Sequence, residues 1–232
     1  METPLNYTAT RAIAVPADFF RQVYTWMGCG LLLTALAAYV TLSSTTLLEL
    51  IFGNKMVFYG LILGELGLVI WLSAAINKLS AKTATLMFLA YSALNGVTFA
   101  SIFLIYTKSS IVSTFMITAG TFGAMSAYGY LTKKDLSSWG SFLFMGLIGV
   151  VIASVVNIFM QSSMVYWVST FCGVIVFVGL TAYDTHKIKQ LAAQGFSSAE
   201  DYHKGAIMGA LRLYLDFINL FLMLLRIFGN RR

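Results

Sequence analysis

The feature that most constrains this chain is a series of apolar segments, each about as long as a membrane-spanning helix. A helix needs about 20 apolar residues to cross the hydrocarbon core of a bilayer. The sequence contains six such runs and a seventh that charged residues interrupt. We expect spanning helices at 23–43, 57–76, 84–106, 111–131, 139–160, 165–185 and 206–228. The chain is therefore predicted to be an all-α integral membrane protein, with a seven-helix domain at 23–228 surrounded by membrane lipid.

The composition argues against several functional classes. Only 10% of the residues are charged and 59% are hydrophobic, whereas about a quarter of a soluble domain is charged. The net charge of +6 lies in short loops beside apolar runs, so we expect positive-inside sorting and no nucleic-acid partner. Cys29 and Cys172 lack metal or redox spacing and are expected to be packing residues. Hydrolase, metalloprotease, P-loop and dinucleotide motifs do not occur, so we expect neither an enzyme nor a bound cofactor.

The distribution of positive charge favours a cytoplasmic N-terminus, with residues 1–22 as a tail. The cytoplasmic segments would then hold nine basic residues, Arg11, Arg21, Lys78, Lys82, Lys133, Lys134, Lys187, Lys189 and Lys204. The outer loops would hold only Lys55 and Lys108. The C-terminal tail at 229–232 falls outside in this topology, together with Arg226, Arg231 and Arg232. Since those arginines argue the other way, six spans with a re-entrant last segment are the alternative.

The stretch at 187–204 is the longest polar connection of the chain. Its sequence, KIKQLAAQGFSSAEDYHK, contains Gly195 and two adjacent serines. We expect a solvated loop with a short amphipathic helix. His186 and His203 flank it and are expected to be solvated rather than catalytic.

Two aspartates occupy costly positions, Asp184 at the end of the sixth span and Asp216 inside the seventh. A charged Asp at the centre of a spanning helix costs about 2.5 to 3.5 kcal/mol, so such a residue usually faces protein or water. Helical spacing places Asp216 on one face with Gly209, Arg212 and Asn219, which we expect to turn inward. If the two carboxyls meet, repulsion and desolvation oppose their double ionisation, and the pair would share a proton. Such a pair is a pH-sensitive latch.

Two interpretations of the aspartates stay open. In the first, Asp184 caps the helix end in water and Asp216 pairs with Arg212 on its own helix. In the second, protonation changes the contact between the last two helices and opens a polar path for cations. Carboxylates suit calcium, but tight calcium binding needs six to eight oxygens. Asp184 and Asp216, with Asn219 beside them, therefore fit a transient calcium site on a conduction path.

Glu65 is a third acid, near the middle of the second span. An ionisable residue at this depth is a functional hypothesis by default. For Glu65, a pore or proton-relay role and a protonated, hydrogen-bonded structural role are equally open. We assign Asn219 the same possible pore or relay role.

These residues carry a resemblance to a known family. LTAYDTHKIK, followed by LYLDFINLFLMLLRIFG, resembles the Bax inhibitor-1 family, also called the transmembrane Bax inhibitor motif family. The likeness extends to TKKDLSSWGSFLFM, to VNIF and to Glu65, and so covers nearly all of the chain after the N-terminal tail. YSALNGVTFASIF and LRIFGNRR are most similar to the bacterial inner-membrane branch.

The resemblance implies a fold, a function and a location. The fold would be seven helices, with the last one central and wrapped by the other six. The function would be a pH-sensitive calcium leak in the bacterial inner membrane, gated by Asp184 and Asp216, with calcium as the permeant ion and protons as the signal. The branch is also similar to a bacterial modulator of a membrane-bound AAA protease. The rival hypothesis is therefore a non-conducting regulator that uses residues 1–22 as a handle, and a proton-coupled transporter ranks third.

The chain departs from the family pattern at two places. Some relatives carry an arginine at the cytoplasmic end of the second span, where it can pair with the first aspartate. This chain has Ile76, Asn77 and Lys78 there, so only Lys78 could substitute, by snorkelling. In addition, Arg212 stands where a small or polar residue is expected. A cation four residues from Asp216 favours the ionised carboxylate, which predicts gating at lower pH than in relatives.

Overall fold

The computed structural model describes residues 17–232, and most of the predicted 1–22 tail lies outside them. The described residues form helices α1 (Ala17–Ser43), α2 (Thr45–Phe52), α3 (Lys55–Ala75), α4 (Ala81–Ile105), α5 (Lys108–Leu131), α6 (Ser137–Met160), α7 (Ser163–Gln194) and α8 (Ala199–Phe228), with a 3₁₀ turn, η1, at Ile76–Lys78. All of the helices except α2 and η1 are long and apolar enough to cross a membrane, which confirms the prediction of seven spans. The short helix α2 was not predicted.

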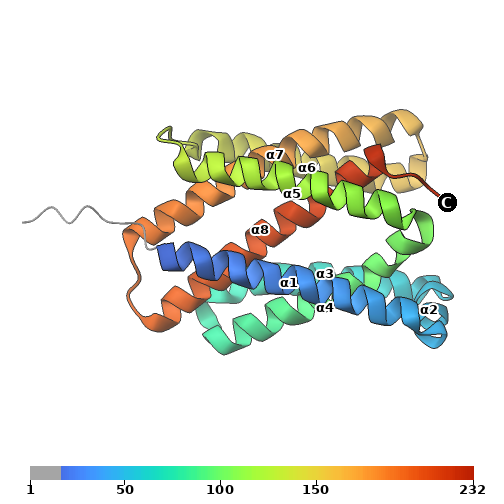
Figure 1. Cartoon of the computed structure of the whole chain (residues 1–232), viewed down its shortest axis with the longest axis horizontal. Coiled ribbons are helices and arrows are strands. Elements are labelled where there is room, and N and C mark those ends of the chain that lie inside the picture. Colours follow the sequence, from blue (N-terminus) through green and yellow to red (C-terminus); the bar gives the residue numbers. More distant parts are fainter. Residues whose placement is uncertain (1–16) are drawn as a thin grey trace, which may run out of the picture.

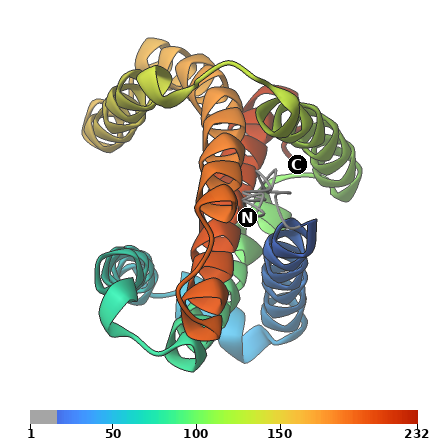
Figure 2. The same cartoon turned by 90° about the vertical axis from the view of Figure 1, so that its left-hand side faces the viewer.

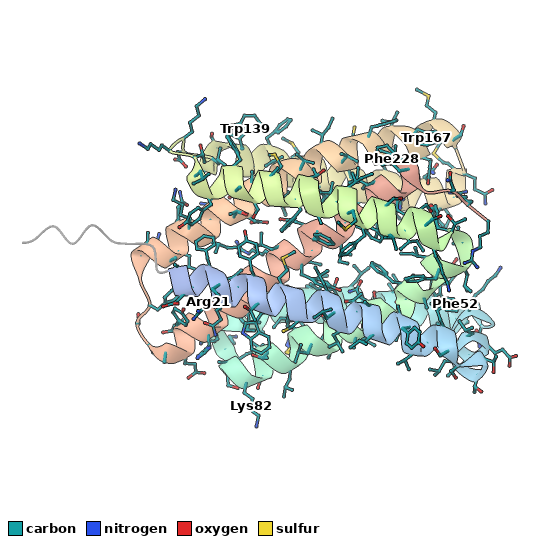
Figure 3. The ribbon with its side chains drawn as sticks, viewed as in Figure 1. Arg21, Phe52, Lys82, Trp139, Trp167 and Phe228 are labelled. Atoms are coloured by element: carbon teal, nitrogen blue, oxygen red, sulfur yellow. The ribbon has the colours of Figure 1, made fainter. Side chains whose placement is uncertain are left out.

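The spanning helices run up and down, so the bundle has two ends (Figure 1). We call the end where α1 begins the N-terminal face; the α3–α4, α5–α6 and α7–α8 connections lie there. The opposite end, which holds α2 and the end of the chain, is the C-terminal face. Figure 3 shows Trp139 towards the N-terminal face and Trp167 towards the C-terminal face. Both rings are exposed, as is typical of tryptophans at the two interfaces of a membrane.

Polar side chains fix where the helices begin. The N-cap hydroxyl of Thr107 accepts a hydrogen bond from the Ser110 amide at the start of α5. Ser162 and Ser198 cap α7 and α8 in the same way. Each cap satisfies an otherwise unpaired backbone donor and typically contributes about 1 kcal/mol.

The connection between α7 and α8 corrects the expected loop at 187–204. Helix α7 continues to Gln194 and α8 begins at Ala199, so only four residues, 195–198, link them. At 1.5 Å per residue, a helix of 32 residues such as α7 is about 48 Å long, against about 30 Å for the hydrocarbon core. The polar stretch is therefore helical and projects beyond the membrane. Gly195, with φ of 78°, makes the turn, because this left-handed backbone favours glycine.

The start of α1 anchors this projecting hairpin. Phe19 packs against Phe196 and Tyr202, with ring centroids 4.8 and 5.2 Å away. His203 is exposed and lies 2.9 Å from the Gln22 amide nitrogen. Helix α8 is continuous from Ala199 to Phe228, so the alternative with a re-entrant last segment is wrong.

Helix α8 is the most buried helix of the bundle. It makes its main contacts with α1, α4, α5 and α7, whereas α3 packs chiefly on α4 and α6 on α7. Figure 2 shows α7 and α8 running through the middle, with α1, α3 and α4 on one side and α5 and α6 on the other. The wrapping of α8 by all six other spans stays a prediction in that detail.

The exposed faces of the helices carry apolar side chains, and the two cysteines also lie on such faces. Helices α3 and α6 expose many large apolar side chains, which suits a surface in contact with acyl chains. Cys29 and Cys172 are free thiols and lie on exposed faces of their helices. Their predicted role as packing residues is therefore wrong.

Candidate functional site

The structure brings Asp184 of α7 and Asp216 of α8 together between the last two helices. Their carboxyl groups lie close enough to interact directly. The Asp184 side chain is 15% exposed, and Asp216 is 4% exposed. Two carboxyls form a hydrogen bond with each other only when one of them holds a proton, since an ionised carboxylate has no donor. Two carboxyls placed this close can share one proton.

Arg212 of α8 pairs with Asp184 across the helix interface. Its Nη1 lies 3.8 Å from the Asp184 Oδ1, and its side chain is 51% exposed. The interpretation in which Arg212 pairs with Asp216 on its own helix is therefore wrong, as is the expectation that Arg212 turns fully inward. The cation that pairs with Asp184 is therefore Arg212 and not Lys78. Lys78 itself is exposed, and within the described residues it forms no ion pair.

One oxygen of the pair has no partner. Oδ2 of Asp216 is buried and accepts no hydrogen bond from residues 17–232. An ionised carboxylate with an unpaired buried oxygen carries a desolvation cost. The arrangement therefore favours one negative charge on the pair, which Arg212 balances.

Hydroxyl groups connect the neighbourhood of Asp184 to two other helices. The Thr185 hydroxyl lies 2.9 Å from the Ser126 hydroxyl of α5. Ser126 is also hydrogen-bonded to the Tyr24 hydroxyl of α1. Buried polar groups of this kind fix the helices that carry them. The sequence pattern did not predict this network. Its only signals were polar Thr185, directly after Asp184, and Ser126 within an apolar span.

Access to the pair differs between the two membrane faces. Towards the N-terminal face, a pocket of about 260 Å³ between α7 and α8 is lined by polar side chains that include Lys187, Gln190, Gln194 and Arg212. Towards the C-terminal face, Phe217, Leu220 and Phe221 follow Asp216 on α8 and are buried. A partly polar pocket therefore reaches Arg212 on one side of the pair, whereas the α8 residues on the other side of Asp216 are apolar.

A contacting carboxyl pair between the last two of seven spanning helices is what the resemblance implied. A family model described as "Inhibitor of apoptosis-promoting Bax1" matches residues 16–232. The chain belongs to the Bax inhibitor-1 family.

The chain is also similar to bacterial proteins over most of its length. Inner membrane protein YbhL of Escherichia coli strain K12 is 57% identical over 215 residues, which are 92% of each chain. An uncharacterized protein of Borreliella burgdorferi is 49% identical over 95% of each chain. Protein RP147 of Rickettsia prowazekii is 43% identical over 92% of this chain and 90% of its own length. Together with the seven spans, the likeness to the E. coli inner membrane protein supports a multi-pass inner-membrane protein of the Bax inhibitor-1 family.

Glu65 lies apart from the carboxyl pair in this family member. It is buried on α3 and accepts a hydrogen bond from the Thr98 hydroxyl of α4. On α8, Tyr214 joins α1 through a 2.7 Å contact between its hydroxyl and the Thr34 hydroxyl. Residues two positions apart on a helix point about 200° apart, so Tyr214 and Asp216 face opposite sides of α8. The hydrogen bond to Thr98 fits the structural interpretation of Glu65, and a relay role stays a prediction.

The structure gives Asn219 and His186 surroundings that the sequence did not indicate. The Asn219 amide nitrogen donates to the Leu215 carbonyl oxygen at 2.8 Å, within its own helix. This bond does not test the pore or relay role predicted for Asn219, which stays a prediction. His186 is 7% exposed rather than solvated. Its Nε2 lies 4.0 Å from Oδ1 of Asp135 in the α5–α6 connection.

Proposed function

We propose that this protein is a pH-sensitive calcium leak of the inner membrane, gated by Asp184 and Asp216. The observation that carries the proposal is the contact of two carboxyl groups between two spanning helices, with Arg212 beside them. A buried acid pair is costly in a membrane protein, and a purely structural contact between α7 and α8 needs no second acid.

The gate follows from the charge of the pair. With one proton present, a single negative charge faces Arg212, and the site is neutral. Loss of that proton leaves two carboxylates in contact, which repel each other by an energy on the order of a few kcal/mol. That repulsion, together with desolvation, drives α7 and α8 apart and admits water. The leak should therefore increase as the pH rises through the second ionisation of the pair.

The same ionisation prepares the site for a cation. Two carboxylates offer hard oxygen ligands of the kind that calcium prefers. Within residues 17–232 there is no group of three or more His, Cys, Asp or Glu side chains that could hold a metal ion. A calcium ion at this position would keep most of its water, so it would pass through the site rather than be stored there.

Calcium entry into dye-loaded proteoliposomes tests the proposal. The purified protein is compared from about pH 5 to about pH 8 with Asp184→Asn, Asp216→Asn and the control Asp18→Asn, which changes an exposed acid on α1. We expect pH-dependent flux in the wild type and the control. Both pair variants should lose the pH dependence, because an amide does not ionise.

Other outcomes of this experiment separate the hypotheses. If all four proteins match empty liposomes at every pH, the leak is excluded and the non-conducting regulator takes its place. Deletion of residues 1–18 should then impair function more than either substitution in the pair. If flux occurs but both pair variants keep the wild-type pH profile, the protein conducts without this gate.

A further inference from the structure

Three arginines at the C-terminal face contradict the charge pattern of the rest of the chain. Arg226, Arg231 and Arg232 lie at the end opposite the main group of basic residues. None of them forms an ion pair with a carboxylate within residues 17–232. The carboxyl pair is in the interior of the bundle, so the proposed gate does not account for these arginines.

Two of the arginines converge on one pocket. A pocket of about 550 Å³ between the ends of α6 and α8 and the start of α7 is lined by Asn157, Gln161, Ser162, Ser163, Tyr166, Trp167, Arg226, Ile227, Gly229 and Arg231. The Arg226 guanidinium lies 5.4 Å from the centre of the Tyr166 ring. Nη2 of Arg231 donates a hydrogen bond to the Tyr166 hydroxyl at 3.3 Å. Tyr166 therefore holds both cations beside each other.

The backbone of the C-terminal tail fixes the position of Arg231. The Thr107 amide donates to the Asn230 carbonyl oxygen at 3.0 Å. The Arg232 amide donates to the Ile105 carbonyl oxygen at 2.9 Å. These bonds tie the tail to the α4–α5 connection on both sides of Arg231. A tail held in this way presents its guanidinium with little loss of conformational freedom on binding.

The chemistry of the pocket fits a phosphate group. Two guanidinium groups without an acidic partner offer paired donors of the geometry that phosphate oxygens accept. Ser163 and Gln161 add neutral donors, and the pocket also meets the N-terminus of α7, whose helix dipole favours an anion. The residues that line the pocket include no acidic side chain.

We propose that this pocket binds the phosphate headgroup of an anionic phospholipid in the leaflet at the C-terminal face. Its position favours a lipid over a free anion. Trp167, which lines the pocket, is exposed at this face of the bundle (Figure 3), where tryptophan typically lies at headgroup depth. Basic pockets between spanning helices bind lipid headgroups in this way. A bound lipid would account for the presence of Arg226 and Arg231 on this face.

Native mass spectrometry of the full-length protein tests this site. The protein is released from vesicles that contain phosphatidylglycerol and phosphatidylcholine with identical acyl chains. The wild type should retain phosphatidylglycerol in preference to phosphatidylcholine. We expect Arg226→Gln/Arg231→Gln to lose that preference by at least about tenfold in relative occupancy.

Two further variants separate the pocket from general charge effects. Lys55→Gln/Lys108→Gln removes the same charge from the same face, at exposed residues outside the pocket, and should retain the lipid. Ser163→Asp places a negative charge in the pocket at the first residue of α7, where an acid favours the helix. This variant should fold and still release the lipid.

Three results would overturn the site. Equal retention of the two lipids by the wild type would show that no anionic headgroup is selected. Equal loss in the Lys55→Gln/Lys108→Gln variant would assign the effect to surface charge. Displacement of phosphatidylglycerol by millimolar inorganic phosphate would identify a free-anion site rather than a lipid site.

Discussion

At the scale of single residues, neighbouring positions on α8 serve different purposes. Tyr214 is fully buried and bonds the Thr34 hydroxyl of α1, whereas Asp216 contacts Asp184 of α7. Arg212, one turn before Asp216, is half exposed and forms an ion pair with Asp184. One side of α8 therefore fixes the helix in the bundle, and the other side carries the ionisable site.

The substitution Arg212→Gln tests the role of the cation. A nearby positive charge favours the ionised form of a carboxylate, and half-exposed ion pairs are weak. We therefore expect the midpoint of the calcium flux profile to move to higher pH by up to about one unit. Calcium entry into proteoliposomes measures this shift, with Arg21→Gln as an exposed control on α1. An unchanged midpoint would show that Arg212 does not contribute to gating.

The substitution Tyr214→Phe tests the scaffold side of α8. It removes a hydroxyl that bonds Thr34, while Thr34 keeps its 2.8 Å bond to the Ser92 carbonyl oxygen. Loss of one buried hydrogen bond should lower the free energy of unfolding by about 1 kcal/mol. Thermal unfolding in detergent measures the effect, with Tyr59→Phe as control because Tyr59 is exposed. Equal stability of the two variants would contradict a stabilising role of this bond.

The site was predictable from sequence only in part. Asp184 and Asp216 stand out because acids within apolar runs are costly, and the structure brings these two together. Of the two interpretations left open for the aspartates, the one that paired Arg212 with Asp216 is contradicted, since Arg212 forms its ion pair with Asp184. Spacing along α8 places Arg212 near Asp216, but the way in which α7 crosses α8 decides which carboxylate it reaches. Periodicity describes one helix at a time and carries no information on that crossing.

At the scale of helices, the close approach of α5 and α7 positions the segment that bears Asp184. A Cβ atom added to Gly129 would lie 2.2 Å from the Ala182 carbonyl oxygen. Gly129→Ala should therefore force the two backbones apart and cost about 1 to 3 kcal/mol of stability. Gly120→Ala on the same helix is the matched control, since nothing lies within 4 Å of its added Cβ.

We expect a loss of stability for Gly129→Ala and none for Gly120→Ala. Gly129→Ala should unfold at a lower temperature in detergent and show an altered pH profile of calcium flux, because Asp184 moves with α7. Gly120→Ala should match or slightly exceed the wild type, since alanine favours a helix. Wild-type stability of Gly129→Ala would refute the close contact.

The helices show where hydropathy succeeds and where it fails. Seven apolar runs predicted seven spans, because the bilayer sets both their length and their composition. The same criterion missed α2, which is only eight residues long. It also missed the last turns of α7 and the first turns of α8, because helices outside the membrane need no apolar run. There, contacts such as that between Phe19 and Phe196 stabilise the hairpin, and they join residues far apart in sequence.

At the scale of the whole molecule, α8 lies between two groups of helices. Helices α1, α3 and α4 lie on one side of it, and α5, α6 and α7 on the other (Figure 2). Tyr214 ties α8 to the first group, and the carboxyl pair ties it to the second. Under the proposed gate, ionisation of the pair would weaken the contact of α8 with α7 and leave its contact with α1 intact. Opening is expected as a movement of the second group away from α8.

The orientation in the membrane follows from the charges at the two faces. The N-terminal face carries Arg21, Lys78, Lys82, Lys133, Lys134, Lys187, Lys189 and Lys204, and the C-terminal face carries Lys55, Lys108 and the three arginines near the chain end. Because basic loops stay in the cytoplasm, we expect the N-terminal face to be cytoplasmic. The seven spans then place the chain end on the opposite side.

Single cysteines introduced into a protein that lacks Cys29 and Cys172 test this orientation. A membrane-impermeant maleimide applied to intact spheroplasts should label Lys108→Cys, in the outer α4–α5 connection, and leave Lys133→Cys unlabelled until the membrane is opened. The reverse pattern would place the polar pocket beside Arg212 on the outside. We would then expect the proposed gate to respond to external rather than cytoplasmic pH, because the pocket that reaches Arg212 lies on that face. The labelling experiment therefore decides which compartment the carboxyl pair senses.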